Sequence, residues 1–359
     1  MLSAPAIVWL LMCGLTGAAS LPEVVSEVRS RILTDFATNV PGLSAAIGHD
    51  GKIIWSEGFG LADLDAKRPV TTQTLFRIGS VSKPMTAAGL MLLVEKGKVD
   101  LDADIHRYVA DFPDKGHPIT ARQLAGHLAG IRHYKGQEFY LNRHYTHLRD
   151  SLRIFENDPL LSVPGEKYSY SSYGYNLIGM VMESAAGRDF LAYMQDAVWT
   201  PLAMTFTMPD DATRSVPQRT RFYKLKEGGG FELEPEVDNS YKWASGGFLS
   251  TPEDLVRFGS AHLQPGLLTP ASLAALFTPQ KTSDGKATQY GIGWEVQKDK
   301  AGHALWFHTG GSVGGTSILL IQPESRMVLA ITANCTDAPL KKSNPAAIIQ
   351  AFSVLFPSK

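Results

Sequence analysis

Apolar residues recur at four-residue spacing at the beginning of the chain, which predicts an amphipathic helix over residues 21–38. The buried face of this helix is expected to carry Val24, Val28, Ile32 and Phe36. Pro41 and Gly42 then end the helix. Residues 43–48 and 52–58 are interpreted as two strands, because the turn signal His49-Asp50-Gly51 stands between them. The chain therefore begins with a helix and a β-hairpin.

Strand-like runs return only near the end of the chain, at residues 290–296, 305–309, 316–321 and 327–332. The stretch from about residue 100 to 235 has the pattern of helices and long loops. One helix is predicted from Ser80 to Glu95, and another ends near Gly187. A final helix is predicted with Asn344 as its N-cap and Pro345 as its first residue.

The predicted strands come from both ends of the chain and the helices lie between them, which favours a mixed α/β (α+β) fold. We expect one antiparallel sheet built from both chain ends and flanked by helices, with an all-helical lobe beside it. Residues 21–80 and 240–359 are assigned to the α/β lobe, and residues 81–239 to the helical lobe, of a single domain. A cleft between the two lobes is the expected place for chemistry.

The composition is that of a soluble globular protein, with 44% hydrophobic and 19% charged residues in a chain of 359. Lysine plus arginine number 34 and aspartate plus glutamate number 35. This balance leaves no net charge that would attract a nucleic acid or an anionic membrane surface, so we predict no nucleic-acid partner.

Residues 4–19 form an uncharged, mostly apolar run that ends in small residues, the pattern of a secretory signal peptide over residues 1–20. The segment predicts a periplasmic or secreted protein. No lysine or arginine precedes it, so a retained N-terminal membrane anchor is the alternative. Cleavage near Ala19 would leave Cys335 as the one cysteine, which forms no intrachain disulfide and is expected to be buried.

The first candidate for chemistry is the pair formed by Ser80 and Lys83, at the predicted start of a helix. Residues three apart lie on one face of a helix, so the Ser80 hydroxyl and the Lys83 amine can meet. A lysine whose pKa is lowered by desolvation can take the proton of a serine nucleophile. The amides at a helix N-terminus favour the oxyanion that forms in acyl transfer.

Two further motifs follow in order along the chain, Tyr-x-Ser at residues 170–172 and His-Thr-Gly at residues 308–310. The order Ser-x-x-Lys, Tyr-x-Ser, His-Thr-Gly resembles the penicillin-recognising serine hydrolases, which include the class C β-lactamases, penicillin-binding proteins and S12 peptidases. Residues 119–134 and 240–251 extend the resemblance, which is closest to the mitochondrial serine β-lactamase-like proteins and their bacterial relatives.

The resemblance implies a β-lactamase/transpeptidase-like fold and a set of catalytic roles. Ser80 is the nucleophile that becomes acylated, and Lys83 holds or accepts its proton. Tyr170 acts as the general base, which requires neighbouring cations such as Lys83 to lower its pKa from about 10. The backbone amides of Ser80 and Gly311 form the oxyanion hole.

The resemblance also implies three substrate contacts. Ser172 stands where relatives have asparagine and donates to the acyl group of the substrate. His308 and Thr309 line a strand edge where an extended substrate pairs. His308 replaces a lysine, and a histidine is only partly charged near neutral pH, so it suits the carboxylate of a β-lactam less well. Both replacements favour the peptidase-like and esterase-like branches.

We therefore predict a serine hydrolase that uses no metal or cofactor and acts through an acyl-enzyme on small peptide-like amides. A carboxylesterase or a weak β-lactamase with the same residues is the alternative among enzymes. A non-catalytic binding or filament-forming scaffold is the alternative outside enzymes. The resemblance to proteins that assemble also favours a homo-oligomer.

Two weaker patterns point to other chemistry. Ser312 lies in a Gly-x-Ser-x-Gly sequence, but a strand is predicted after it and no histidine follows His308, so we do not interpret Ser312 as a nucleophile. Several histidines precede Asp150 without the compact spacing of a zinc site, and are interpreted as surface, packing or loop residues. They are His127, His133, His144 and His147.

Overall fold

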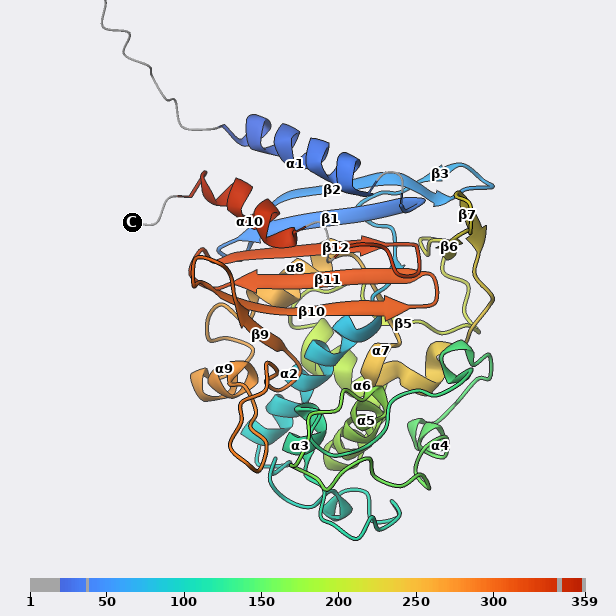
Figure 1. Cartoon of the computed structure of the whole chain (residues 1–359), viewed down its shortest axis with the longest axis vertical. Helices are drawn as coiled ribbons and strands as arrows, with labels where there is room; N and C mark the ends of the chain where they lie inside the picture. The colour runs from blue at the N-terminus through green and yellow to red at the C-terminus, as the bar shows by residue number, and fades with distance from the viewer. Residues whose placement is uncertain (1–19, 37–38, 341–343, 357–359) are drawn as a thin grey trace, which may run out of the picture.

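The computed structural model describes residues 20–36, 39–340 and 344–356, which form a seven-stranded antiparallel sheet and a helical lobe beside it (Figure 1). The strand order is β3-β2-β1-β12-β11-β10-β9. Strands from the two ends of the chain meet at the centre of the sheet, where Leu43 of β1 lies opposite Ala333 of β12. This arrangement confirms the predicted α/β fold with one sheet built from both chain ends.

The strands of the large sheet are β1 (Gly42–His49), β2 (Lys52–Asp63), β3 (Arg68–Pro69), β9 (Glu295–Lys298), β10 (Ala304–Ser312), β11 (Gly315–Gln322) and β12 (Met327–Ala333). A three-stranded sheet contains β4 (Phe76–Arg77), β8 (Phe248–Ser250) and β5 (Met208–Pro209), and a hairpin contains β6 (Tyr223–Leu225) and β7 (Phe231–Leu233).

The α-helices are α1 (Leu21–Phe36), α2 (Ser82–Glu95), α3 (Ala121–Ala125), α4 (Leu148–Leu152), α5 (Ser172–Ala186), α6 (Phe190–Met194), α7 (Trp243–Gly246), α8 (Pro252–Ser260), α9 (Pro270–Phe277) and α10 (Pro345–Ser353). The other helical segments are the 3₁₀ turns η1 (Gly79–Val81), η2 (Ile105–Arg107), η3 (Glu138–Tyr140) and η5 (Asn239–Lys242), and the π-helical segment η4 (Gln195–Trp199).

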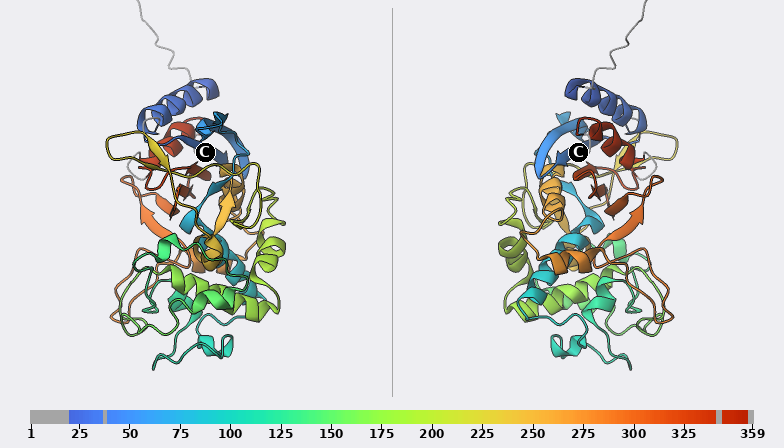
Figure 2. Two further views of the ribbon diagram at one scale, coloured as in Figure 1. Left: turned by 90° about the vertical axis from the view of Figure 1, so that its right-hand side faces the viewer. Right: turned by 90° about the vertical axis from the view of Figure 1, so that its left-hand side faces the viewer.

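Helices cover both faces of the large sheet. The terminal helices α1 and α10 lie side by side over one face (Figure 2), where they pack on Ile47 and Ile331. Helix α8 covers the other face, where Ala46 and Ala330 join its buried residues. Successive side chains of a strand point to opposite faces, so β1 and β12 bury apolar residues in both directions.

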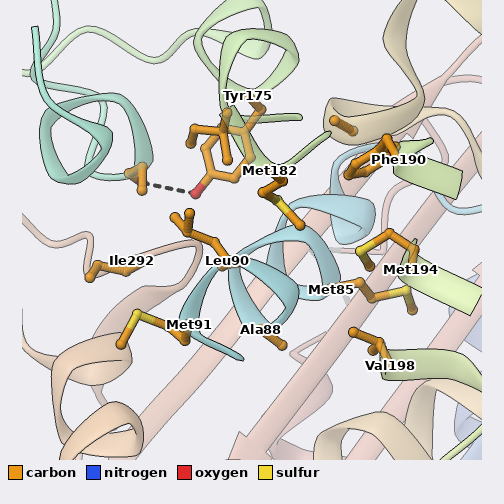
Figure 3. Packing of buried hydrophobic residues seen from close by; sticks show 14 of the residues in the cluster. Met85, Ala88, Leu90, Met91, Tyr175, Met182, Phe190, Met194, Val198 and Ile292 are labelled. Carbon is orange, nitrogen blue, oxygen red and sulfur yellow. Dashed lines mark hydrogen bonds between the residues drawn. The ribbon is translucent and has the colours of Figure 1, made fainter. Parts of the chain in front are cut away.

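The helical lobe is packed around α2, whose residues from Ser82 to Met91 are all buried. Figure 3 shows Met85 and Leu90 of α2 surrounded by side chains from α5, α6 and η4. The Tyr175 hydroxyl of α5 lies in this core and donates to the carbonyl oxygen of Ala125 at 2.8 Å. Since α2 is enclosed on nearly every side, packing fixes the position of the helix that carries Lys83.

The helical lobe differs from its prediction, because residues 81–239 are not all-helical. They also contain β5, which pairs with β8, and the β6–β7 hairpin. These strands have two or three residues each, too few to produce a periodic sequence pattern. The division of the chain into residues 21–80 with 240–359 and residues 81–239 stays a prediction, since one apolar cluster joins α2, α5, α8 and β12.

One predicted strand boundary and one predicted helix cap need correction. The strand predicted at residues 290–296 begins only at Glu295, because Gly291 donates its amide to the carbonyl of Trp294 and Gly293 adopts a φ of +81°, which together form a turn. Asn344 precedes α10 as predicted, but its side chain makes no capping hydrogen bond.

Two further predictions concern Cys335 and the N-terminal segment. Cys335 is buried, as predicted. The signal peptide predicted for residues 1–20 lies outside the described residues, apart from Ser20. Among the helices that the structure describes, none combines the length and the apolar character that a membrane span requires.

Candidate active site

Ser80 lies in the turn η1, immediately before α2, rather than in the helix itself as predicted. Gly79 adopts a φ of +50°, which glycine tolerates without strain, and so leads the chain from β4 into the helix. A Cβ atom on Gly79 would lie 2.5 Å from the carbonyl oxygen of Gly311. This close approach places Ser80 where the large sheet meets the helical lobe.

Strand β10 lies against the turn that carries Ser80. A Cβ atom on Gly310 would lie 1.9 Å from the carbonyl oxygen of Ile78, so only glycine fits there. The Ser317 hydroxyl of β11 donates to the same carbonyl at 2.7 Å and holds the turn against the sheet. Ser80 and Gly311, the residues predicted to form the oxyanion hole, are therefore neighbours at the same cavity.

Lys83 meets Ser80 as the three-residue spacing predicts. Its Nζ lies 2.9 Å from Oγ of Ser80, 3.1 Å from Oγ of Ser172 and 2.7 Å from the carbonyl oxygen of Ser245. An ammonium group can donate to all three oxygens. A neutral amine can donate to Ser172 and Ser245 while its lone pair accepts the Ser80 proton. The three contacts thus suit both the neutral and the charged form of Lys83. A residue that accepts a proton during the reaction must be stable in both forms.

The surroundings of Lys83 favour the neutral amine. Lys83 is completely buried, and its three hydrogen-bond partners are uncharged. Burial lowers the pKa of Lys83 well below its usual value, and the charge of Lys242 lowers that pKa further. A neutral Lys83 can take the proton of Ser80, whereas an ordinary surface lysine is protonated near pH 7.

Tyr170 lies beside this pair, with Nζ of Lys83 4.9 Å from the centroid of its ring. Burial raises the pKa of Tyr170 above its usual range, and interaction with the Ser80 side chain opposes that rise only in part. The expectation that nearby cations lower this pKa is therefore wrong, because burial dominates and also disfavours the charged form of Lys83. Tyr170 is a protonated phenol that can donate a hydrogen bond.

Two histidines hold the segment that carries Tyr170 in place. Nδ1 of His127 accepts the backbone N–H of Ser171 at 3.2 Å, and Nδ1 of His133 accepts that of Ser172 at 3.1 Å. Burial lowers the pKa of both rings, that of His133 to about 4, so both are neutral and Nδ1 is free to accept. Their interpretation as packing or loop residues fits these contacts.

The site is a cavity of about 430 Å³ lined by residues of both lobes. The predicted site residues that line it are Ser80, Tyr170, Ser172, His308, Thr309 and Gly311. Lys83 lies behind Ser80 and contacts it. The other lining residues were not predicted to act in catalysis or substrate binding, and they are His133, Tyr134, Phe139, Tyr168, Lys242, Ser245, Gly246, Tyr290 and Glu295. Of these, Lys242 offered a signal, as a lysine within an otherwise uncharged segment.

His308 lines the cavity from β10 and is bonded through both ring nitrogens. Nδ1 lies 2.7 Å from the carbonyl oxygen of Thr309, which can only accept, so Nδ1 carries a proton. Nε2 lies 2.8 Å from the hydroxyl of Tyr290, which can donate to a neutral ring or accept from a protonated one. The two contacts suit either charge state of the imidazole. His308 therefore does not supply the permanent positive charge of a lysine.

The structure does not support the two weaker patterns, Ser312 as a nucleophile and the histidines near Asp150 as metal ligands. Ser312 is buried at the end of β10, and the chain continues directly into β11, whereas a nucleophile elbow leads into a helix. His144 instead contacts Asp238, with 2.9 Å between Nδ1 and Oδ2. Within the residues that the structure describes, no group of three or more histidines, cysteines and carboxylates could hold a metal ion.

A serine in contact with a desolvated lysine, at the junction of an antiparallel sheet and a helical lobe, defines the class of penicillin-recognising serine hydrolases. Comparison with known proteins agrees with this class. The family model described as Beta-lactamase matches residues 29–352. The chain belongs to this family of serine hydrolases.

One relative supports the same assignment, and two solved structures share the fold. The chain is 31% identical to the human serine beta-lactamase-like protein LACTB, mitochondrial, over 79% of this chain and 69% of that protein. The D-stereospecific amidohydrolase from Streptomyces sp. superposes with a TM-score of 0.76 at 23% identity, over 91% of this chain and 97% of that chain. The octameric penicillin-binding protein homologue from Pyrococcus abyssi also has a TM-score of 0.76, at 23% identity, over 94% and 77% of the two chains.

Proposed function

We propose that this protein cleaves amide bonds of small peptide-like substrates through an acyl-enzyme on Ser80. The observation that carries the proposal is the 2.9 Å contact between Nζ of Lys83 and Oγ of Ser80, with the amine completely buried. Membership of a serine hydrolase family and the likeness to a D-stereospecific amidohydrolase support an amide substrate. The cavity beside Ser80 is large enough for a short peptide-like compound and too small for a folded protein.

The proposed reaction begins with proton transfer from Ser80 to the neutral Lys83 amine. The Ser80 oxygen attacks the substrate carbonyl carbon, and the backbone amides of Ser80 and Gly311 stabilise the resulting oxyanion. Tyr170 then donates its phenolic proton to the leaving nitrogen and regains one from Lys83, so the C–N bond breaks and the acyl-enzyme remains. Water reverses these proton transfers in the second half of the reaction.

Covalent labelling tests the proposal. A fluorophosphonate carries a reactive phosphorus that traps an activated serine, so we expect one equivalent of probe on the peptide that contains Ser80. The measurement is intact mass followed by peptide mapping of the labelled protein. Heat-unfolded protein is the control and should remain unlabelled. Absence of any label, or a label on another residue, would reject the proposal and favour a scaffold.

A carboxylesterase or weak β-lactamase activity is the second candidate, because the same nucleophile can attack esters and β-lactams. The absence of a permanent cation at position 308 argues against an efficient β-lactamase. Replacing His308 with lysine is expected to raise the rate of acylation by a chromogenic cephalosporin about tenfold, since an ammonium group forms a charged hydrogen bond to the substrate carboxylate. Stopped-flow absorbance measures this rate.

The control for His308→Lys is His308→Gln, which loses the ring without adding a charge. The glutamine variant should not gain cephalosporin acylation. An equal increase in both variants, or no increase in either, would show that the missing cation does not limit reaction with β-lactams.

The location and assembly of the protein are further parts of this proposal. The apolar run at residues 4–19 supports a periplasmic or secreted protein, with retention at the membrane by that segment as the alternative. The octameric relative supports a homo-oligomer of this chain. The intact mass obtained in the labelling experiment also reports whether the N-terminal segment has been removed.

A further inference from the structure

Lys242 is a second lysine at the site that the proposed reaction does not use. Only 1% of its surface is exposed, yet it lines the cavity beside Ser80. Aromatic rings surround its ammonium group, and the centroid of the Phe139 ring is the nearest, 4.6 Å from Nζ. Within the described part of the chain, no hydrogen bond or ion pair engages this ammonium group.

Neighbouring groups do not neutralise Lys242. The negative charge of Asp210 raises the pKa of Lys242. The Asp210 oxygens, however, already accept hydrogen bonds from Arg77 at 2.7 Å, Asn239 at 2.6 Å and Arg219 at 3.2 Å. Burial, together with the charge of Arg77, lowers the pKa of Lys242 to about 7, although Asp210 opposes this change. The titratable groups around Lys242 are Arg77, Asp210, Lys83, His133, Tyr134 and Tyr241.

The aromatic rings stabilise the Lys242 ammonium group only in part. A buried ammonium group that has no hydrogen-bond or ion-pair partner is unfavourable, and a methionine would fill the same space without that penalty. A lysine at position 242 is therefore explained if a bound ligand supplies a negative charge beside its ammonium group. The strand edge at the other side of the cavity does not supply a permanent cation, because position 308 is a histidine rather than a lysine.

We propose that Lys242 binds a carboxylate of the substrate, outside the bond that is cleaved. The inference rests on the proposed function of the site and adds a substrate class to it, namely peptide-like amides that carry an anionic group. The ammonium group of Lys242 loses hydrogen bonds to water when it is buried. A charge-assisted hydrogen bond to the substrate carboxylate compensates for that loss. The aromatic side chains of Tyr134 and Phe139 exclude water around the pair.

Binding to the Ser80→Ala variant tests the inference without requiring turnover. Two matched ligand pairs distinguish the two parts of a substrate. The first pair is glutaryl 4-nitroanilide and its methyl ester, which differ by a carboxylate on the acyl side of the amide bond. The second pair is the pentanoyl anilides of 4-aminobenzoate and 4-aminobenzamide, which differ by a carboxylate on the leaving-group side. Calorimetric titration should show that the carboxylate in one pair improves affinity about 10- to 100-fold over its neutral partner.

Variants of Lys242 identify the source of that preference. Lys242→Met keeps the length of the side chain and should reduce the preference to less than about threefold, whereas Lys242→Arg should retain most of it. Lys226→Met is the matched control, because it removes one positive charge from an exposed residue that does not line the cavity. Thermal unfolding of each variant checks that it is folded.

The outcomes separate this inference from the proposed function. Equal binding of both members of each pair, including no binding by any, would overturn the inference even if Ser80 is labelled. A preference that persists in Lys242→Met would also overturn it. A preference lost in Lys242→Met supports the carboxylate site even if the probe fails to label Ser80. Should Lys242→Met not fold, the wild-type preference and the retention of affinity in Lys242→Arg still decide the question.

Discussion

Replacing Ser80 with alanine is expected to abolish acyl-enzyme formation and to lower turnover by about six orders of magnitude. The variant removes the oxygen that attacks the substrate, so Lys83 and Tyr170 have no nucleophile to activate. The position of Lys83 does not depend on the hydroxyl, because its amine also contacts Ser172 and Ser245. The measurements are intact mass after exposure to a fluorophosphonate and steady-state hydrolysis of a peptide-like nitroanilide.

The matched control for Ser80→Ala is Ser312→Ala, which tests the other serine in a nucleophile-like sequence. Ser312 is buried and does not line the cavity, so activity should stay within about threefold of wild type. Labelling that survives in Ser80→Ala would contradict the assignment of the nucleophile. Loss of labelling in a folded Ser312→Ala variant would contradict it as well.

The sequence alone was sufficient for features that depend on local spacing. The contact between Ser80 and Lys83 follows from a separation of three residues, and the turn before the helix preserves it. The long strands of the sheet were also predictable, because β1, β2, β10, β11 and β12 contain enough residues to carry a periodic pattern. Short strands such as β5 arise from tertiary pairing and leave no such pattern.

Long-range contacts of the site were predictable only through family resemblance. Tyr170 lies far from Ser80 along the chain, and nothing in its own tyrosine-rich segment selects it over Tyr168 or Tyr173. The structure brings Tyr168 and Tyr170 to the cavity, and Tyr170 interacts with the side chain of Ser80. Tyr173 instead packs against Phe155, with 4.5 Å between the ring centroids. Position in the fold, rather than residue type, makes the difference.

Electrostatic properties were the least predictable part of the site, because burial cannot be read from a residue name. The resemblance implied that cations lower the pKa of Tyr170, but desolvation raises it. Lys242 was left without a role for the same reason, since its sequence context does not reveal that its ammonium group is buried without a carboxylate partner.

Replacing Lys83 with methionine is expected to lower the rate of Ser80 acylation by about 10²- to 10⁴-fold, the usual contribution of a general base. Methionine fills the same space without a lone pair that can accept a proton. The Lys83→Arg variant is the matched comparison, because arginine keeps a positive charge but does not deprotonate. Both variants should be equally impaired if Lys83 acts as a base, whereas arginine should rescue activity if only its charge matters.

The pH dependence of acylation distinguishes Lys83 from Tyr170 as the base. Burial lowers the pKa of Lys83 below 10.5, so the wild-type rate should rise with pH through that lowered value and then stay constant. Burial raises the pKa of Tyr170 above 10, so a tyrosine base would make the rate rise further beyond pH 10. Stopped-flow acylation with a fluorogenic ester measures the profile. A rate that keeps rising above pH 10 and loses that rise in Tyr170→Phe would transfer the role of base to Tyr170.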